Sequence, residues 1–180
     1  LLLRHQFGDL NANILAVISN HADLRELVER FGLPFHTIPH DAVTRDEHEA
    51  LLLECLGQYD IDFIVLAKYM RILSANVVAP YEGKLINIHH SFLPAFIGAK
   101  PYAQAFARGV KMIGATAHFV TNALDEGPII VQQVVNVDHN DDAVAMSQAG
   151  REIETQTLAK ALKLVFNDRV FINGNKTVVF

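Results

Sequence analysis

Three polar residues in this sequence have the types and spacing needed for chemistry at a carbonyl group. Asn87 and His89 follow the apolar residues Leu85 and Ile86. If this stretch is a strand, residues two apart lie on the same face. Asp125 lies at a second junction between a strand and a loop, where it could orient the imidazole. An amide, an imidazole and a carboxylate together can polarise a carbonyl, move a proton and fix a tautomer. The set contains no obvious protein nucleophile, which favours direct attack by water or by an amine.

Each of these residues also has an ordinary structural interpretation. The sequence has nine histidines, so spacing alone supports a structural His89 as well as a catalytic one. A strand-end Asn87 can bond its own backbone, and Asp125 two residues before Gly127 is typical of a turn. His90 is adjacent to His89, but on a continuing strand the two side chains would face opposite ways. We therefore expect no metal site at this pair.

The motif around these residues resembles that of a known family. Asn-x-His-x-Ser-x-Leu-Pro at residues 87–94, followed by Asp-x-Gly at residues 125–127, is similar to the catalytic signature of the folate-dependent formyltransferases. The longer string from Asn87 to Tyr102 resembles the branch of this family that hydrolyses 10-formyltetrahydrofolate. His90 supports this branch, because the transferases usually carry proline there. The resemblance covers nearly the whole chain.

The resemblance implies a reaction and a set of site residues. Asn87 would bond the formyl oxygen, His89 would transfer a proton, and Asp125 would hold the His89 ring and help to align a water molecule. The implied substrate is 10-formyltetrahydrofolate, hydrolysed to formate and tetrahydrofolate to supply purine synthesis and balance the one-carbon pool, without a prosthetic group. The implied substrate-binding residues are Met70, Arg71, Ile72, Leu73, His118, Val120, Thr121, Asn122 and Leu124. His90 would support the site.

Two other functions remain open at this point. The same Asn-His-Asp set would serve transfer of the formyl group to an amine such as glycinamide ribonucleotide. A folate-binding module without enzymatic activity is the second alternative. The sequence does not decide whether His89 or Asp125 is the formal base. Apart from the resemblance, composition would assign Met70, Ile72 and Leu73 to the core.

Composition and charge indicate a globular domain that does not bind nucleic acid. The chain has 180 residues, with 51% hydrophobic and 19% charged residues, which is enough to bury a core. Its net charge of −5, without a cluster of lysine and arginine, argues against a nucleic-acid surface. No apolar run approaches the roughly 20 residues of a membrane span. The single Cys55 excludes an internal disulfide and is expected in the core. A cytoplasmic location fits best, and the resemblance implies a homo-oligomer.

Alternating apolar patterns predict an α/β fold. Strands are expected at about residues 12–18, 35–38, 62–67, 85–89, 112–121 and 129–137, with a closing hairpin at 170–172 and 176–180. Helices are expected at about residues 24–31, after a capping box at 44–47, and at 101–108 and 142–166. This order predicts a Rossmann-like, mostly parallel sheet with helices on both faces. No glycine-rich fingerprint follows the first strand, so a dinucleotide site is not expected.

The start of the chain suggests that a first strand is missing. The sequence opens on Leu1-Leu2-Leu3 and a charged run typical of a helix, whereas an α/β domain normally begins with a buried strand. We expect residues 1–180 to form one formyltransferase-like catalytic domain that lacks this strand. The resemblance further implies a small N-terminal regulatory domain of the ACT type in the full protein.

Overall fold

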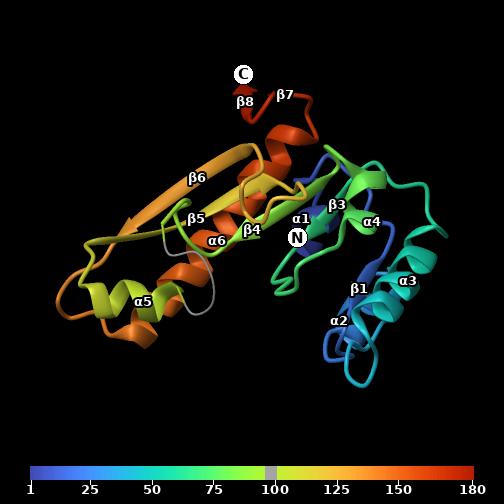
Figure 1. Ribbon diagram of the computed structural model, residues 1–180, viewed down its shortest axis with the longest axis horizontal. Helices are drawn as coiled ribbons and strands as arrows, with labels where there is room; N and C mark the ends of the chain where they lie inside the picture. Colours follow the sequence, from blue (N-terminus) through green and yellow to red (C-terminus); the bar gives the residue numbers. More distant parts are fainter. Residues whose placement is uncertain (96–100) are drawn as a thin grey trace. The chain divides into compact units, whose positions relative to one another are not determined.

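The computed structural model describes residues 1–95 and 101–180. It contains two compact units, Leu1–Asp62 and Phe63–Phe180 (Figure 1). The string from Asn87 to Tyr102 that carries the family resemblance includes residues 96–100, which lie outside the described residues. Within the described ranges, no helix is long and apolar enough to cross a membrane.

The first unit, residues 1–62, is built around one parallel pair of strands. Its elements are α1 (Leu2–Gln6), β1 (Val17–Ser19), α2 (Arg25–Arg30), β2 (Phe35–Thr37) and α3 (Arg45–Leu56). Strands β1 and β2 can run parallel because α2 provides the crossover between them. Helix α3 begins at the predicted capping box, in which the Thr44 hydroxyl accepts from the Glu47 N–H and the Glu47 carboxylate accepts from the Thr44 N–H. Cys55 is buried in α3, as expected.

The apolar face predicted around α2 is only partly buried. Val28 is buried as its position predicts, whereas Leu24 is 54% exposed and Leu27 46% exposed. Periodicity identifies an apolar face but does not specify what packs against it. The first strand is also shorter than predicted, because residues 12–16 precede β1 without strand structure.

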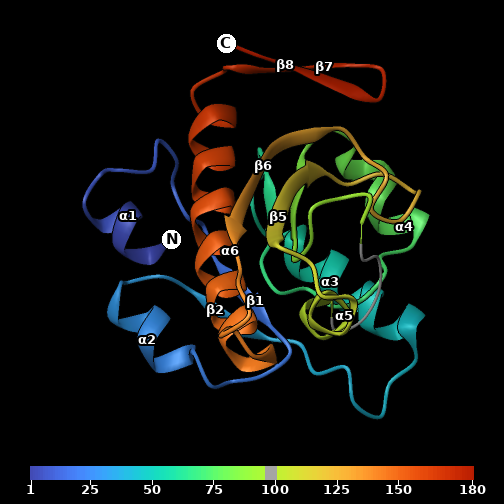
Figure 2. The same cartoon turned by 90° about the vertical axis from the view of Figure 1, so that its left-hand side faces the viewer.

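The second unit, residues 63–180, contains a four-stranded sheet in the order β3-β4-β5-β6 (Figure 1). Its elements are β3 (Ile64–Leu66), α4 (Ala75–Val78), the 3-10 helix η1 (Ala79–Tyr81), β4 (Leu85–His89), α5 (Pro101–Arg108), β5 (Met112–Phe119), β6 (Ile129–Asn136), α6 (Ala143–Val165), β7 (Val170–Asn173) and β8 (Lys176–Val179). The long helix α6 packs against β4, β5 and β6, and Figure 2 shows it alongside β5 and β6. Its predicted inward residues Leu158, Ala161 and Leu162 are buried. The predicted hairpin forms from β7 and β8.

The predicted α/β class is confirmed, but the sheet is mixed rather than mostly parallel. Strands β3 and β4 run parallel, whereas β5 is antiparallel to both of its neighbours, β4 and β6. The segment of residues 120–128 between β5 and β6 is too short for the crossover that parallel neighbours require. The apolar patterns therefore located the strands of this sheet but did not specify their directions.

Candidate active site

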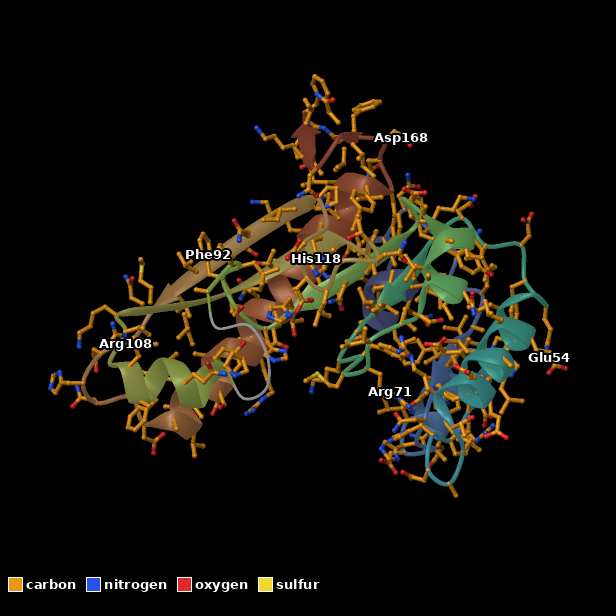
Figure 3. The ribbon with its side chains drawn as sticks, viewed as in Figure 1. Glu54, Arg71, Phe92, Arg108, His118 and Asp168 are labelled. Atoms are coloured by element: carbon orange, nitrogen blue, oxygen red, sulfur yellow. The ribbon has the colours of Figure 1, made fainter. Side chains whose placement is uncertain are left out.

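The three residues expected to be catalytic converge beside the β4–β5 pair in the second unit. Asn87 and His89 lie on β4, opposite His118 and Thr116 of β5, and Figure 3 marks His118 on this sheet. Asp125 lies in the loop after β5, with its Oδ2 atom 3.3 Å from His89 Nδ1. Its other oxygen, Oδ1, lies 3.7 Å from His118 Nε2. The predicted convergence of an amide, an imidazole and a carboxylate is therefore confirmed.

The Asp125 carboxylate holds the His89 ring in one orientation. A carboxylate can only accept, so His89 Nδ1 donates its proton to Asp125 Oδ2. This hydrogen bond is the main cause of the lowered pKa of Asp125, which keeps the carboxylate ionised at neutral pH. The lone pair of the neutral His89 ring is then on Nε2, a buried atom with no hydrogen-bond partner among the described residues. A nitrogen in this state is suited to accept a proton from a bound water molecule.

A second histidine orients the Asn87 amide. His118 Nδ1 donates to the Phe119 carbonyl oxygen at 2.9 Å, so the lone pair of the neutral ring is on Nε2. Burial is the main cause of the lowered pKa of His118, and it favours this neutral form. His118 Nε2 therefore accepts from Asn87 Nδ2 at 3.3 Å. The amide nitrogen of Asn87 faces His118, and its second N–H remains for another acceptor.

The loop that carries Asp125 returns to the sheet at Gly127. A methyl group added to Gly127 would overlap the carbonyl oxygen of Phe119 in β5. The Phe119 N–H also donates to the Pro128 carbonyl oxygen at 2.9 Å. Asp125 itself has a φ of 56°, in the left-handed region, which Asp adopts more readily than most residues other than glycine. The Asp-x-Gly spacing thus follows from a close backbone approach that holds the carboxylate beside His89.

We expect Gly127→Ala to destabilise the protein, because the added methyl group would overlap a backbone carbonyl. The expected loss in the free energy of unfolding is about 2–3 kcal/mol, as for other overpacked sites, and urea denaturation measures it. Gly57→Ala is the matched control. Gly57 has an ordinary φ of −64°, and an added methyl group there would lie 3.4 Å from its nearest neighbour, the Leu53 carbonyl oxygen. Equal stability of the two variants would contradict this account of Gly127.

Hydrogen bonds tie the segment after His89 to strands β5 and β6. The buried Thr116 hydroxyl donates to the Ser91 carbonyl oxygen at 2.9 Å and accepts from the Leu93 N–H at 3.1 Å. The Gln132 amide donates to the Leu93 carbonyl oxygen at 3.0 Å. The Ser91 hydroxyl donates to the Ala95 carbonyl oxygen at 2.6 Å. The motif residues Ser91 and Leu93 therefore shape the chain that leaves β4.

His90 does not face away from His89 as the sequence predicted. Strand β4 ends at His89, so the strand alternation no longer applies to the next residue. The two rings stack, with their centroids 5.0 Å apart and their planes 12° from parallel. In the part of the chain that the structure describes, no group of three or more His, Cys, Asp or Glu side chains is arranged to hold a metal ion.

The residues expected to bind the substrate, apart from His118, lie in two loops of the second unit. Residues 70–73 follow β3, and residues 120–124 follow β5. Because β3 runs parallel to β4, the first of these loops leaves the sheet at the edge where His89 ends β4. Arg71, labelled in Figure 3, has a buried Nη1 atom without a hydrogen-bond partner among the described residues. Thr121 donates its hydroxyl to the Ala123 carbonyl oxygen at 3.2 Å.

The apolar side chains of these loops are exposed. Met70 is 69% exposed, Ile72 57% and Leu124 52%. The assignment of Met70 and Ile72 to the core, which composition suggested, is therefore wrong. Ligand sites are lined mainly by apolar side chains with a few polar groups among them. Asn122 is also exposed, and Val120 is half-buried.

We expect the stability of the protein to fall between about pH 7 and pH 5, in part because of His118. The pKa of His118 is lowered in the folded state, so the unfolded chain, in which the histidine pKa is about 6.5, binds the proton first. The stability due to the neutral ring is complete above the unfolded pKa and is lost as the pH falls towards the folded pKa. His118→Asn cannot titrate, and its stability should therefore fall less over this range.

Urea unfolding at a series of pH values measures this effect. His21→Asn, which removes an exposed histidine of the first unit, is the control for the type of substitution. If the stability of His118→Asn depended on pH as strongly as that of the wild type, His118 would not contribute to the loss of stability at low pH.

Comparison with known proteins agrees with the geometry. Residues 1–162 match the family model described as formyl transferase. The chain is 58% identical to the formyltetrahydrofolate deformylase of Haemophilus influenzae and 52% identical to that of Escherichia coli. Each alignment spans 179 residues, which is 99% of this chain and 64% of the relative. The chain therefore spans slightly less than two thirds of the length of these relatives.

Solved structures give the same grouping. The crystal structure of a formyltetrahydrofolate deformylase from Pseudomonas syringae pv. tomato matches with a TM-score of 0.96 and 47% identity, over 99% of this chain and 60% of that chain. Glycinamide ribonucleotide transformylase 1 from Symbiobacterium toebii matches with a TM-score of 0.92 and 32% identity, over 99% of this chain and 86% of that chain.

Proposed function

Because the chain belongs to the formyl transferase family, we propose that it supplies the catalytic site for hydrolysis of 10-formyltetrahydrofolate to formate and tetrahydrofolate. The observation that carries this proposal is the buried Nε2 atom of His89, which has no hydrogen-bond partner among the described residues. It belongs to a ring that Asp125 orients, two residues along β4 from Asn87. The relatives at 58% and 52% identity bear the name of this reaction. The amine-specific transformylase is more distant, at 32% identity, which favours water over an amine as the acceptor.

In the proposed first step, His89 activates the water molecule. Its Nε2 lone pair accepts a proton while the water oxygen bonds to the formyl carbon. The ionised Asp125 carboxylate, bonded to Nδ1, stabilises the positive charge that forms on the ring. The lowered pKa of Asp125 makes its carboxylate a weak base. We therefore assign the proton transfer to His89 and the orientation of the ring to Asp125.

Asn87 stabilises the tetrahedral intermediate in this mechanism. Negative charge grows on the formyl oxygen as the carbon becomes tetrahedral, and the second N–H of the Asn87 amide can donate to it. His118 holds the amide in place through the other N–H, so the donor is oriented before the reaction begins. One such preorganised donor is typically worth roughly 100- to 1000-fold in rate.

The second step breaks the bond between the formyl carbon and N10. The proton on His89 Nε2 passes to N10 as the amine leaves, and the carbonyl of formic acid re-forms. The proton taken from water thus ends on tetrahydrofolate, and His89 returns to its neutral form. This balance requires neither a protein nucleophile nor a prosthetic group.

The proposed substrate lies between the two loops that follow β3 and β5. The backbone of residues 70–73 would bond the edge of the pterin ring, and residues 120–124 would face it. The exposed side chains of Met70, Ile72 and Leu124 support this arrangement, because a flat heterocycle can cover them.

We further propose the setting in which this site works. The protein would act in the cytoplasm, which is consistent with a lone buried cysteine, Cys55. It would form a homo-oligomer, and an N-terminal regulatory domain of the ACT type would complete the whole protein. Size-exclusion chromatography with light scattering on the protein encoded by the complete gene tests the oligomeric state.

Incubation with 10-formyltetrahydrofolate in the absence of any amine tests the proposed reaction. The protein encoded by the complete gene should release formate and tetrahydrofolate in equal amounts. No turnover until an amine is supplied would assign it to the transferases. Tight binding of the folate without turnover under either condition would support a binding module instead.

A further inference from the structure

The ring of His90 connects the proposed site to a pair of residues outside it. Beyond its stack on His89, His90 lies against Tyr102, with the ring centroids 6.3 Å apart and the planes 47° from parallel. Tyr102 is the second residue of α5, and its hydroxyl donates to Oε1 of Glu154 on α6 at 2.6 Å. A continuous series of contacts therefore runs from Asp125 through His89, His90 and Tyr102 to Glu154.

The Tyr102 ring lies directly on the backbone of α6. A methyl group added to Gly150, in the middle of this helix, would overlap the ring carbons and the hydroxyl oxygen of Tyr102. Glycine is one of the poorest residues for a helix interior, and the space needed by the ring explains its presence here. Burial and the hydrogen bond to Glu154 raise the pKa of Tyr102. The hydroxyl therefore keeps its proton and remains a donor.

The neutral form of His90 suits a position beside a ring that becomes charged. Burial and the neighbouring His89 lower the pKa of His90, while Glu154 and Asp125 act in the opposite direction. A neutral ring can lie against the imidazolium of His89 that forms during the proposed reaction. Two charged rings at a centroid distance of 5.0 Å would repel each other.

We propose that Tyr102 and Glu154 are positioning residues that hold His90 flat against His89. They would thereby fix the plane in which His89 Nε2 faces the formyl group, so this inference rests on the proposed hydrolysis. The hydrogen bond to Asp125, at 3.3 Å, fixes the direction of Nδ1 but does not by itself remove the freedom of the ring to turn about that direction. The stacked ring removes this freedom, and a misplacement of about 1 Å can cost roughly 100-fold in rate.

A pair of substitutions on the two facing helices tests the proposal. Gly150→Ala displaces the Tyr102 ring, and Tyr102→Ala removes it. Each should lower kcat for formate release by about 10- to 100-fold, per folded site, with less than about a threefold change in KM. In the double variant the clash no longer exists, so its kcat should equal that of Tyr102→Ala alone. Circular dichroism and folate-binding stoichiometry give the fraction of folded protein in each sample.

Two conservative variants distinguish the contribution of the Tyr102 ring from that of its hydrogen bond to Glu154. Tyr102→Phe keeps the ring over Gly150 but loses the bond to Glu154, and Glu154→Gln keeps an acceptor for the hydroxyl. Both should retain more activity than Tyr102→Ala, with Glu154→Gln the less impaired of the two. This order of rescue is expected for a positioning role and not for a general loss of folding.

The proposal would be overturned if folded Tyr102→Ala had the kcat of the wild type. It would also be overturned if the loss in the double variant were the product of the losses in the two single variants. Formate release by the wild-type protein tests the proposed function separately. If the wild type releases none, that function fails, and a crystal structure of Tyr102→Ala then decides the positioning role. Persistence of the His89–His90 stack in that structure would overturn it, and loss of the stack would support it.

Discussion

The variant His89→Ala is expected to lose about 100- to 10,000-fold in kcat for formate release, because the group that would take a proton from water is removed. Folate binding should change little, since the His89 ring is buried and would act on the water rather than on the pterin. Steady-state assays of formate, together with a fluorescence titration of the folate, measure both quantities. His139→Ala, which removes an exposed histidine between β6 and α6, is the matched control.

The role assigned to Asp125 can be tested in the same background. If Asp125 acts through His89, the double variant His89→Ala/Asp125→Ala should be no slower than His89→Ala alone. A further loss in the double variant would indicate that Asp125 moves a proton by itself. Near wild-type turnover in His89→Ala would remove His89 from the mechanism.

Asn87→Ala should lower kcat by about 100- to 1000-fold, because the transition state loses a preorganised donor to the developing oxyanion. The Michaelis constant should change much less than kcat, since this hydrogen bond strengthens only as charge develops. Asn136→Ala, at the exposed end of β6, is the control. A rise in KM at constant kcat would mean that Asn87 binds the ground state only, contrary to the proposed role.

The residues proposed to be catalytic could be identified as candidates from the sequence, because the properties that single them out are local. Asn87 and His89 share a face of β4 because side chains alternate along any strand. Asp125 and Gly127 lie in a short loop, where an Asp-x-Gly pattern is readable as a turn. The family resemblance then selected these residues over their structural interpretations. The distance of 3.3 Å between Asp125 and His89 agrees with that selection.

Other features of the site depend on contacts between distant parts of the chain. His118 orients Asn87 because the register of β4 and β5 places the two residues side by side, and no local pattern specifies that register. Tyr102 and Glu154 are 52 residues apart in sequence and meet only because α5 packs on α6. A glycine inside a long helix, Gly150, was the one local signal for this contact, since glycine is unfavourable there without a packing reason.

The orientation of His90 was predicted for a strand that continues past His89. Strand β4 ends at His89 as expected, and hydrogen bonds from Thr116 shape the chain that follows, so the alternation does not reach His90. Hydrogen bonds from a neighbouring strand cannot be inferred from the pattern of one strand. The same limit applies to strand direction, since side chains point alternately to the two faces in parallel and antiparallel strands alike.

Competition between water and an amine is the most direct test of the central claim, that this site hydrolyses the formyl group. The protein encoded by the complete gene is incubated with 10-formyltetrahydrofolate, with and without saturating glycinamide ribonucleotide, and both formate and the formylated amine are quantified. Water attack guided by His89, Asp125 and Asn87 predicts the same yield of formate in both samples and no formylated amine. Accumulation of the formylated amine at the expense of formate, with little turnover when the amine is withheld, would contradict it.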